Sequence, residues 1–63
     1  MQQLEMPAYT VREAAKYIGI DRVTLYGWVQ QGRVAAERDV AGQLRIPYGE
    51  VWRLIKERER AMR

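Results

Sequence analysis

The sequence contains no cysteine and no histidine. Without cysteine, disulfide bonds and thiolate metal sites are excluded. Without histidine, the commonest general base and the commonest zinc ligand are missing as well. The carboxylates are scattered along the chain, and no nucleophile–base pair is recognisable. The sequence therefore predicts a protein that is not an enzyme and that uses no metal and no cofactor.

Long apolar runs are also lacking. No segment approaches the roughly 20 apolar residues that a membrane-spanning helix needs. The N-terminus carries Glu5 and has no apolar core segment, so no signal peptide is visible. We therefore expect a cytoplasmic protein without a membrane partner.

What the chain does contain is a folding composition. Of its 63 residues, 48% are apolar and 30% are charged, a balance typical of folded domains. A chain of this length has room for one small core but not for an additional enclosed substrate pocket. The net charge is +3, and nine of the eleven basic residues are arginine, which makes forked contacts with phosphate and guanine. Many small proteins of other function carry as much charge.

The first helix is predicted over Val11–Ile18. Thr10 offers a hydroxyl N-cap and Glu13 follows three residues later, which is the capping-box pattern of a helix start. Gly19 is the residue expected at a left-handed helix end. Before the helix, we expect a flexible lead-in over residues 1–8 and a single domain over residues 9–63, with a short strand starting at Tyr9. The expected inner positions of the helix are Ala14, Ala15 and Ile18.

A second helix is predicted over Arg22–Gln31, with Asp21 as its N-cap and Gly32 at its end. Its expected inner positions are Leu25, Trp28 and Val29. Because only a short turn joins the two helices, they must pack at a steep angle. Ala15 is small where the first helix comes close to the second. Gly19 lies in the turn, where a positive φ is needed. This spacing predicts a helix-turn-helix over Val11–Gln31.

The second half of the chain predicts a β-hairpin and a final helix. The hairpin strands are expected at Val34–Asp39 and Gln43–Ile46, with a turn at Ala41 and Gly42 and with Pro47 closing the second strand. The last helix is expected from Gly49 to Ala61. Its expected inner positions are Val51, Trp52, Leu54 and Ile55. The predicted fold is mainly α-helical with a small β-hairpin, which is a winged helix-turn-helix.

The second helix of such a fold is the one that enters the major groove of DNA. Its outward side chains suit base contacts, because arginine pairs with guanine, glutamine with adenine, and valine with the thymine methyl group. Tyr26 offers a hydroxyl to a phosphate. Gly27 is unusual inside a helix, and two explanations are open: close approach of a phosphate or of the hairpin, and local packing. The candidate contacts on this helix are Arg22, Val23, Thr24, Tyr26 and Gln30.

Further contacts are predicted from the hairpin and from the first helix. A basic hairpin beside a recognition helix reaches a phosphate or the adjacent minor groove, and Arg45 is expected to face outward because it lies between two inward apolar residues. The alternative is that these arginines only serve solubility. At the start of the first helix, side chains and backbone amides reach the DNA backbone. The candidates are Arg38, Gln43 and Arg45 in the hairpin and Thr10, Arg12 and Lys16 in the first helix.

The sequence resembles the MerR-like winged helix-turn-helix superfamily, and within it the small excisionase-type and BldC-type branch. The resemblance rests on Tyr9–Ala15, Ile18–Asp21, Thr24–Trp28 and Arg45–Pro47, together with Gly32. It implies that the Arg22–Gln31 helix enters the major groove and that the Val34–Ile46 hairpin is the wing. Arg22, Val23 and Tyr26 match contacting positions, and Arg45 matches the basic wing residue. Asp21 and Val23 depart from the residues that are usual there, so the base preference is not carried over.

These observations predict a small transcriptional regulator that binds double-stranded DNA sequence-specifically, located at the nucleoid. The alternatives are an excisionase-type or other architectural recombination factor, the DNA-targeting domain of a larger transposon or phage protein, and a protein-interaction module without DNA. We expect further copies of the chain to bind cooperatively on DNA, because one recognition helix spans only a few base pairs. Lys56–Arg63 lacks a sustained heptad, which argues against a coiled-coil dimer. No small-molecule effector is expected within this chain.

Overall fold

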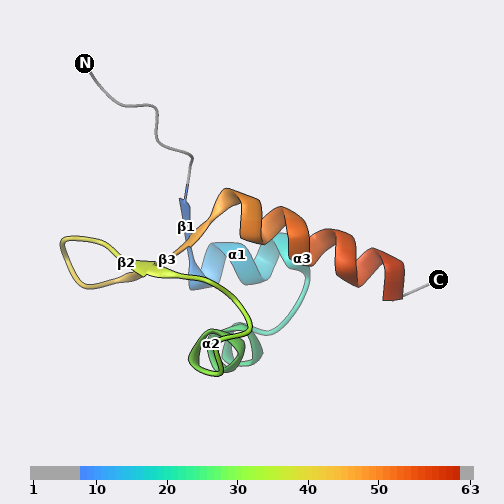
Figure 1. Cartoon of the computed structure of the whole chain (residues 1–63), viewed down its shortest axis with the longest axis horizontal. Helices are drawn as coiled ribbons and strands as arrows, with labels where there is room; N and C mark the ends of the chain where they lie inside the picture. The colour runs from blue at the N-terminus through green and yellow to red at the C-terminus, as the bar shows by residue number, and fades with distance from the viewer. Residues whose placement is uncertain (1–7, 62–63) are drawn as a thin grey trace, which may run out of the picture.

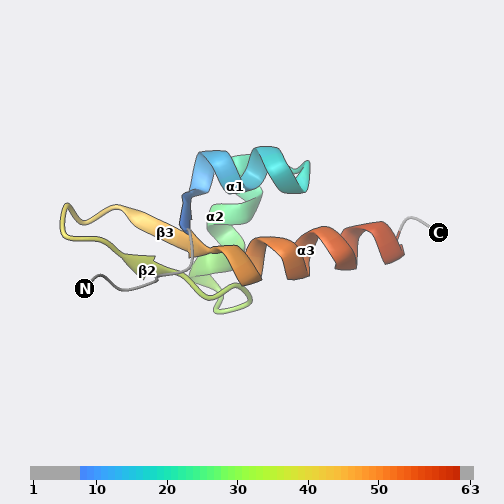
Figure 2. The same cartoon turned by 90° about the horizontal axis from the view of Figure 1, so that it is seen from above.

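The predicted order of helices and strands is present in the computed structural model, which describes residues 8–61. The elements are β1 (Ala8–Thr10), α1 (Val11–Ile18), α2 (Arg22–Gln30), β2 (Glu37–Arg38), β3 (Leu44–Pro47) and α3 (Tyr48–Ala61). α2 and α3 each pack mainly against α1, and β2 and β3 project from one end as the wing (Figure 1). Figure 2 shows the wing and the second half of α3 at opposite ends of the molecule. The fold is thus a winged helix-turn-helix.

The two helices of the helix-turn-helix are capped as predicted. The Thr10 hydroxyl accepts a hydrogen bond from the Glu13 amide at 3.0 Å, and the Glu13 carboxylate accepts one from the Thr10 amide at 3.1 Å. Gly19 ends α1 in the left-handed region with φ 89°. The Asp21 carboxylate accepts a hydrogen bond from the Val23 amide at 3.0 Å and begins α2. Local hydrogen bonds and a left-handed glycine therefore define these three helix ends.

The hairpin is part of a three-stranded antiparallel sheet, with β3 between β1 and β2. In this register Tyr9 pairs with Ile46, and Ala8 pairs with Pro47. Ala8, which the sequence pattern predicts as part of the flexible lead-in, therefore belongs to the sheet. Residues 1–7 of that predicted segment lie outside the described part of the chain. The first hairpin strand is shorter than predicted, because Val34 is not in a strand and is buried in the core.

The core is a single cluster at the junction of the helices and the sheet. It contains the side chains Ala14, Ala15, Ile18, Leu25, Val34, Ile46, Val51 and Leu54. Leu25 and Ile46 are its largest fully buried members. Small side chains on α1 let the other two helices pack close to it, so this cluster sets the angle at which α2 is presented.

Trp52 was expected inside this core, and that prediction was wrong, because its side chain is 49% exposed. Val51, Leu54 and Ile55 occupy the side of α3 that packs against the core. Trp52 lies about 100° around the helix from Val51, at the edge of the contact, where it lines a surface hollow together with Tyr9 and Tyr48. Trp28 is half-buried against the core as predicted.

Candidate nucleic-acid interface

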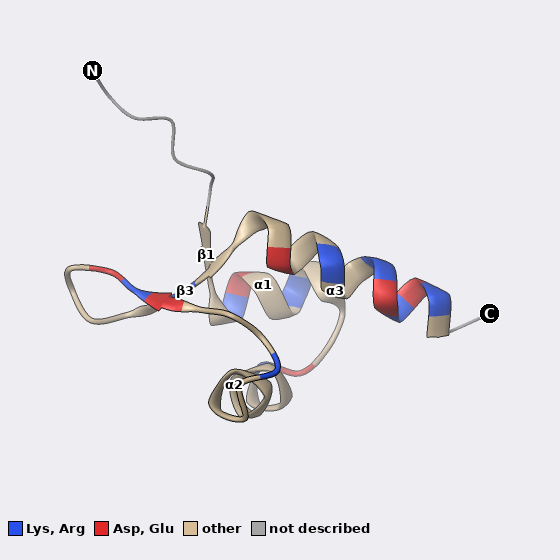
Figure 3. Cartoon of the chain, in the orientation of Figure 1, with Lys and Arg blue, Asp and Glu red and all other residues tan. Residues whose placement is uncertain are grey.

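The outward face of α2 carries apolar and aromatic side chains that the core does not use. Val23 is 72% exposed and Tyr26 is 43% exposed. Arg22 is the single charged residue of α2, and Figure 3 shows this nearly uncharged helix below the charged segments of α1 and α3. A helix with this composition offers side chains that suit base-edge contacts on its surface.

An open groove of about 430 Å³ lies between α2, the start of α1 and the wing. We call it the wing-side groove. Its lining includes three arginines, one from each of these elements, and no carboxylate. The positive charge of such a hollow favours an anionic partner such as a phosphate backbone. It brings together the predicted contact residues Thr10, Arg12, Arg22, Val23, Tyr26, Arg38 and Gln43.

Four other predicted contact residues lie outside this groove, namely Lys16, Thr24, Gln30 and Arg45. Lys16 is in the last turn of α1, and Thr24 and Gln30 are exposed on α2. Arg45 was expected to face outward with its charge available. Instead its side chain is about two-thirds covered, and its Nε donates to Asp39 Oδ2 at 2.9 Å. Arg45 therefore already has an anionic partner inside the wing.

Comparison with known proteins agrees with this geometry. A family model described as a helix-turn-helix domain matches residues 8–59, which is most of the chain. The chain belongs to the helix-turn-helix domain family. No curated protein matches it. The family match supports a small DNA-binding domain, and the MerR-like branch stays a prediction.

The wing of this helix-turn-helix domain is organised by one carboxylate that sequence reasoning had not singled out. Asp39 accepts hydrogen bonds from the Ala41 and Gln43 amides, each at 2.9 Å, and from Arg45. The Gln43 amide and the Arg45 side chain hold the pKa of Asp39 below its ordinary value. An aspartate two residues before Ala-Gly is the sequence signal of such a turn. Asp39 thereby fixes the tip from which Arg38 and Gln43 reach the wing-side groove.

The base of the wing is tied to α3 by a second carboxylate. Glu50 Oε2 accepts a hydrogen bond from the Ala35 amide at 2.7 Å, and Glu50 Oε1 accepts one from Arg53 Nε at 2.6 Å. The Arg53 side chain is the main cause that holds the pKa of Glu50 below its ordinary value. These bonds anchor the segment that connects α2 to β2. They set the position of the wing relative to the recognition helix.

Gly27 lies on the outward side of α2. A Cβ atom added there would meet nothing within 4 Å. Among the described residues, neither the wing nor any other segment packs against it, so internal packing does not require a glycine at this position. Approach of a phosphate to Gly27 stays a prediction.

None of the helices within residues 8–61 is long and apolar enough to cross a membrane. In the same part of the chain, no three acidic side chains are grouped so that they could hold a metal ion.

Proposed function

We propose that this helix-turn-helix domain is a sequence-specific binder of double-stranded DNA that acts, without catalysis, as a small transcriptional regulator. In this proposal α2 enters the major groove and the wing contacts the adjacent backbone or minor groove. The observation that carries the proposal is the wing-side groove. It joins the exposed face of α2 to arginines from α1 and the wing, with no carboxylate in its lining.

Base readout is assigned to α2. Arg22 forks onto guanine O6 and N7, and Gln30 pairs with adenine. Val23 contacts a thymine methyl group, which its large exposure supports. The Tyr26 hydroxyl donates to a phosphate at the edge of the major groove, and Thr24 is near the start of the helix, where either kind of contact is within reach.

Backbone contacts are assigned to the elements on either side of the wing-side groove. At the start of α1, Thr10 and Arg12 face the groove, and Lys16 lies further along the same helix. From the wing, Arg38 and Gln43 line the groove, and Arg45 acts mainly by holding Asp39 in place. The Arg38 guanidinium donates to the Gly42 carbonyl at 2.7 Å, which leaves its other N–H groups for a phosphate.

The test is selection of bound duplexes from a random DNA pool, followed by binding measurements on the selected site at several salt concentrations. We expect a defined site of a few base pairs and an affinity that falls steeply with salt, because phosphate contacts release counterions. An affinity independent of salt, or no retention of any duplex, would refute the proposal.

We also propose that several copies bind cooperatively along DNA. A single module of this kind buries only about 600–1,000 Å² of protein surface on DNA, which favours a second copy for specific occupancy. The selected sites are then expected to contain closely spaced repeats. A Hill coefficient of one on a duplex with several repeats would contradict this part of the proposal.

A further inference from the structure

A second groove flanks α2 on the side away from the wing. α2 and α3 both pack mainly against α1, so the space between α2 and the second half of α3 stays open, with a volume of about 310 Å³. We call it the α3-side groove. Trp28 and Leu54 are among its apolar lining, and its charged residues are Arg33, Arg53, Glu57 and Arg58. None of these arginines was singled out from the sequence.

Two of the three arginines keep their charge available. Arg53 donates to Glu50 and Glu57, so its charge is offset. Neither Arg33 nor Arg58 lies within ion-pair distance of a carboxylate of residues 8–61. The groove therefore presents two uncompensated guanidinium groups beside the recognition helix.

The guanidinium group of Arg33 is held in place by a contact within the chain. The Cζ of Arg33 lies 4.8 Å from the centre of the Trp28 ring, a cation–π contact. The Arg33 backbone is fixed as well, because its amide donates to the Trp28 carbonyl at 2.9 Å after the left-handed Gly32. Positioned arginines lose less conformational freedom when they bind an anion.

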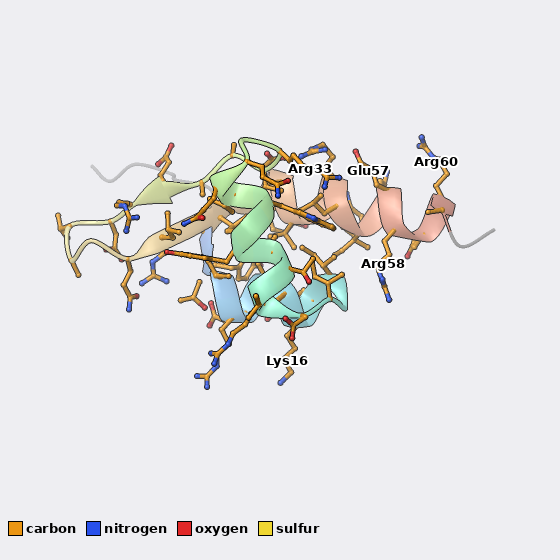
Figure 4. The ribbon with its side chains drawn as sticks, turned by 90° about the horizontal axis from the view of Figure 1, so that it is seen from below. Lys16, Arg33, Glu57, Arg58 and Arg60 are labelled. Atoms are coloured by element: carbon orange, nitrogen blue, oxygen red, sulfur yellow. The ribbon has the colours of Figure 1, made fainter. Side chains whose placement is uncertain are left out.

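Arg58 is placed against the turn between α1 and α2. Its Nε would be 3.4 Å from a Cβ atom added at Gly19. Figure 4 shows Arg58 and Lys16 extending toward one edge of the molecule, and Arg33 and Arg60 toward the other. Arg33 and Arg58, which both line the α3-side groove, therefore extend toward opposite edges of the molecule.

The two grooves border opposite sides of α2. Tyr26 lines the wing-side groove and Trp28 lines the α3-side groove, and residues two apart on a helix are about 200° apart. A helix in the major groove, which is about 12 Å wide, lies between two phosphate backbones, one from each strand. The wing-side groove accounts for only one of them.

From this arrangement, and resting on the DNA binding proposed above, we infer that the α3-side groove binds the phosphate backbone of the other DNA strand. Arg33 and Arg58 are its contact residues. The contact is independent of base sequence, because phosphate oxygens carry no base identity. The protein thereby holds the duplex from both sides of the recognition helix.

The test compares Arg58→Gln with Lys56→Gln on the duplex selected in vitro. Both substitutions remove one positive charge from α3, but Lys56 lies on the other side of the helix, with its Nζ 5.6 Å from the Trp52 ring. We expect Arg58→Gln, and likewise Arg33→Gln, to flatten the slope of log affinity against log salt by about one. Lys56→Gln is expected to keep the wild-type slope. Thermal unfolding followed by circular dichroism verifies that each variant is folded.

A second measurement locates the contact on the duplex. Single phosphates are replaced by neutral methylphosphonates, and each duplex is measured with wild type, Arg58→Gln and Arg38→Gln. The Arg58 effect is the loss of affinity that Arg58→Gln causes, and the Arg38 effect is the loss that Arg38→Gln causes. We expect the phosphate replacement that removes the Arg58 effect to lie on one strand and the replacement that removes the Arg38 effect to lie on the other.

The outcomes separate this inference from the proposed function. If wild type binds the selected duplex in an Arg22-dependent way, but Arg58→Gln and Lys56→Gln behave alike, the inference is overturned and the proposed function stands. The inference is also overturned if the phosphate replacements that remove the Arg58 effect and the Arg38 effect lie on the same strand. If wild type retains no duplex, both are overturned.

Discussion

The helix-turn-helix supplies half of the buried core, through Ala14, Ala15, Ile18 and Leu25, whereas no residue of the wing from Glu37 to Gln43 is buried. The helices are held by apolar burial and by their caps. The wing tip is held by hydrogen bonds to the ionised carboxylate of Asp39. Burial responds little to pH, while an ionised acceptor is lost in acid. The part that we propose to read bases and the part that we propose to contact the backbone can therefore be perturbed separately.

The largest effect is expected from the core of the helix-turn-helix. Leu25→Ala should lower the free energy of unfolding by roughly 2–5 kcal/mol, which is much of the stability of a domain this small. Val23→Ala, two residues earlier on the same helix but exposed, should change it by less than about 0.5 kcal/mol. Urea unfolding followed by circular dichroism measures both. Equal losses would show that α2 is not held by burial.

The next largest effect is expected on DNA affinity, where base contacts and backbone contacts should respond differently to mutation. Arg22→Ala on α2 should weaken binding to the selected site by roughly 1–3 kcal/mol and relax the preference at one base pair. Arg38→Ala in the wing should weaken binding to all sequences alike and flatten the salt dependence. Fluorescence anisotropy with the selected site and single-base variants separates the two. A sequence-specific loss from Arg38→Ala would contradict the division of roles between α2 and the wing.

Gly27→Ala should give opposite changes in stability and binding. Alanine is favoured over glycine inside a helix by about 1 kcal/mol, and the added Cβ meets no described residue, so the unfolding midpoint should rise. If DNA approaches the bare backbone there, the same methyl group should reduce affinity. Thermal melts and anisotropy test both halves. Unchanged affinity in a stabilised variant would mean that DNA does not come close to Gly27.

The smallest effect on global stability is expected from acid acting on the wing. The pKa of Asp39 is lowered in the folded state, chiefly by the Gln43 amide, so its contribution is complete above about pH 4 and is lost as the pH falls through the lower folded-state value. Hydrogen exchange should show that the Ala41 and Gln43 amides lose protection in acid before the α1 amides do. Asp39→Asn should remove this difference in pH dependence. If the wing amides and the α1 amides of wild type lose protection at the same pH, the wing is not stabilised separately.

Short-range features of the fold were predictable because the residues that form them are neighbours in the chain. The capping box of Thr10 and Glu13 and the Asp21 cap each span three residues or fewer, so their geometry follows from local hydrogen bonds. The same holds for the left-handed Gly19. Seven of the predicted contact residues meet in the wing-side groove, because the helix-turn-helix and the wing that follows it leave few ways to arrange them.

The exposure of Trp52 shows where the pattern becomes ambiguous. Val51, Trp52, Leu54 and Ile55 form a wide apolar arc on α3, and the periodicity alone admits all four as inner residues. The width of the contact with the other elements decides which of them are covered. That width depends on side chains such as Ala14 and Ala15, which are far away in the sequence.

By itself, the sequence determined the caps, the steep turn between the two helices and the outward face of α2, since these depend on residue type and spacing within a few positions. Only the tertiary structure decided that β1 completes the sheet and that Arg33 and Arg58 flank α2 on its second side. The physical reason is that these contacts join segments whose separation in space is set by core packing, and no local preference encodes that separation.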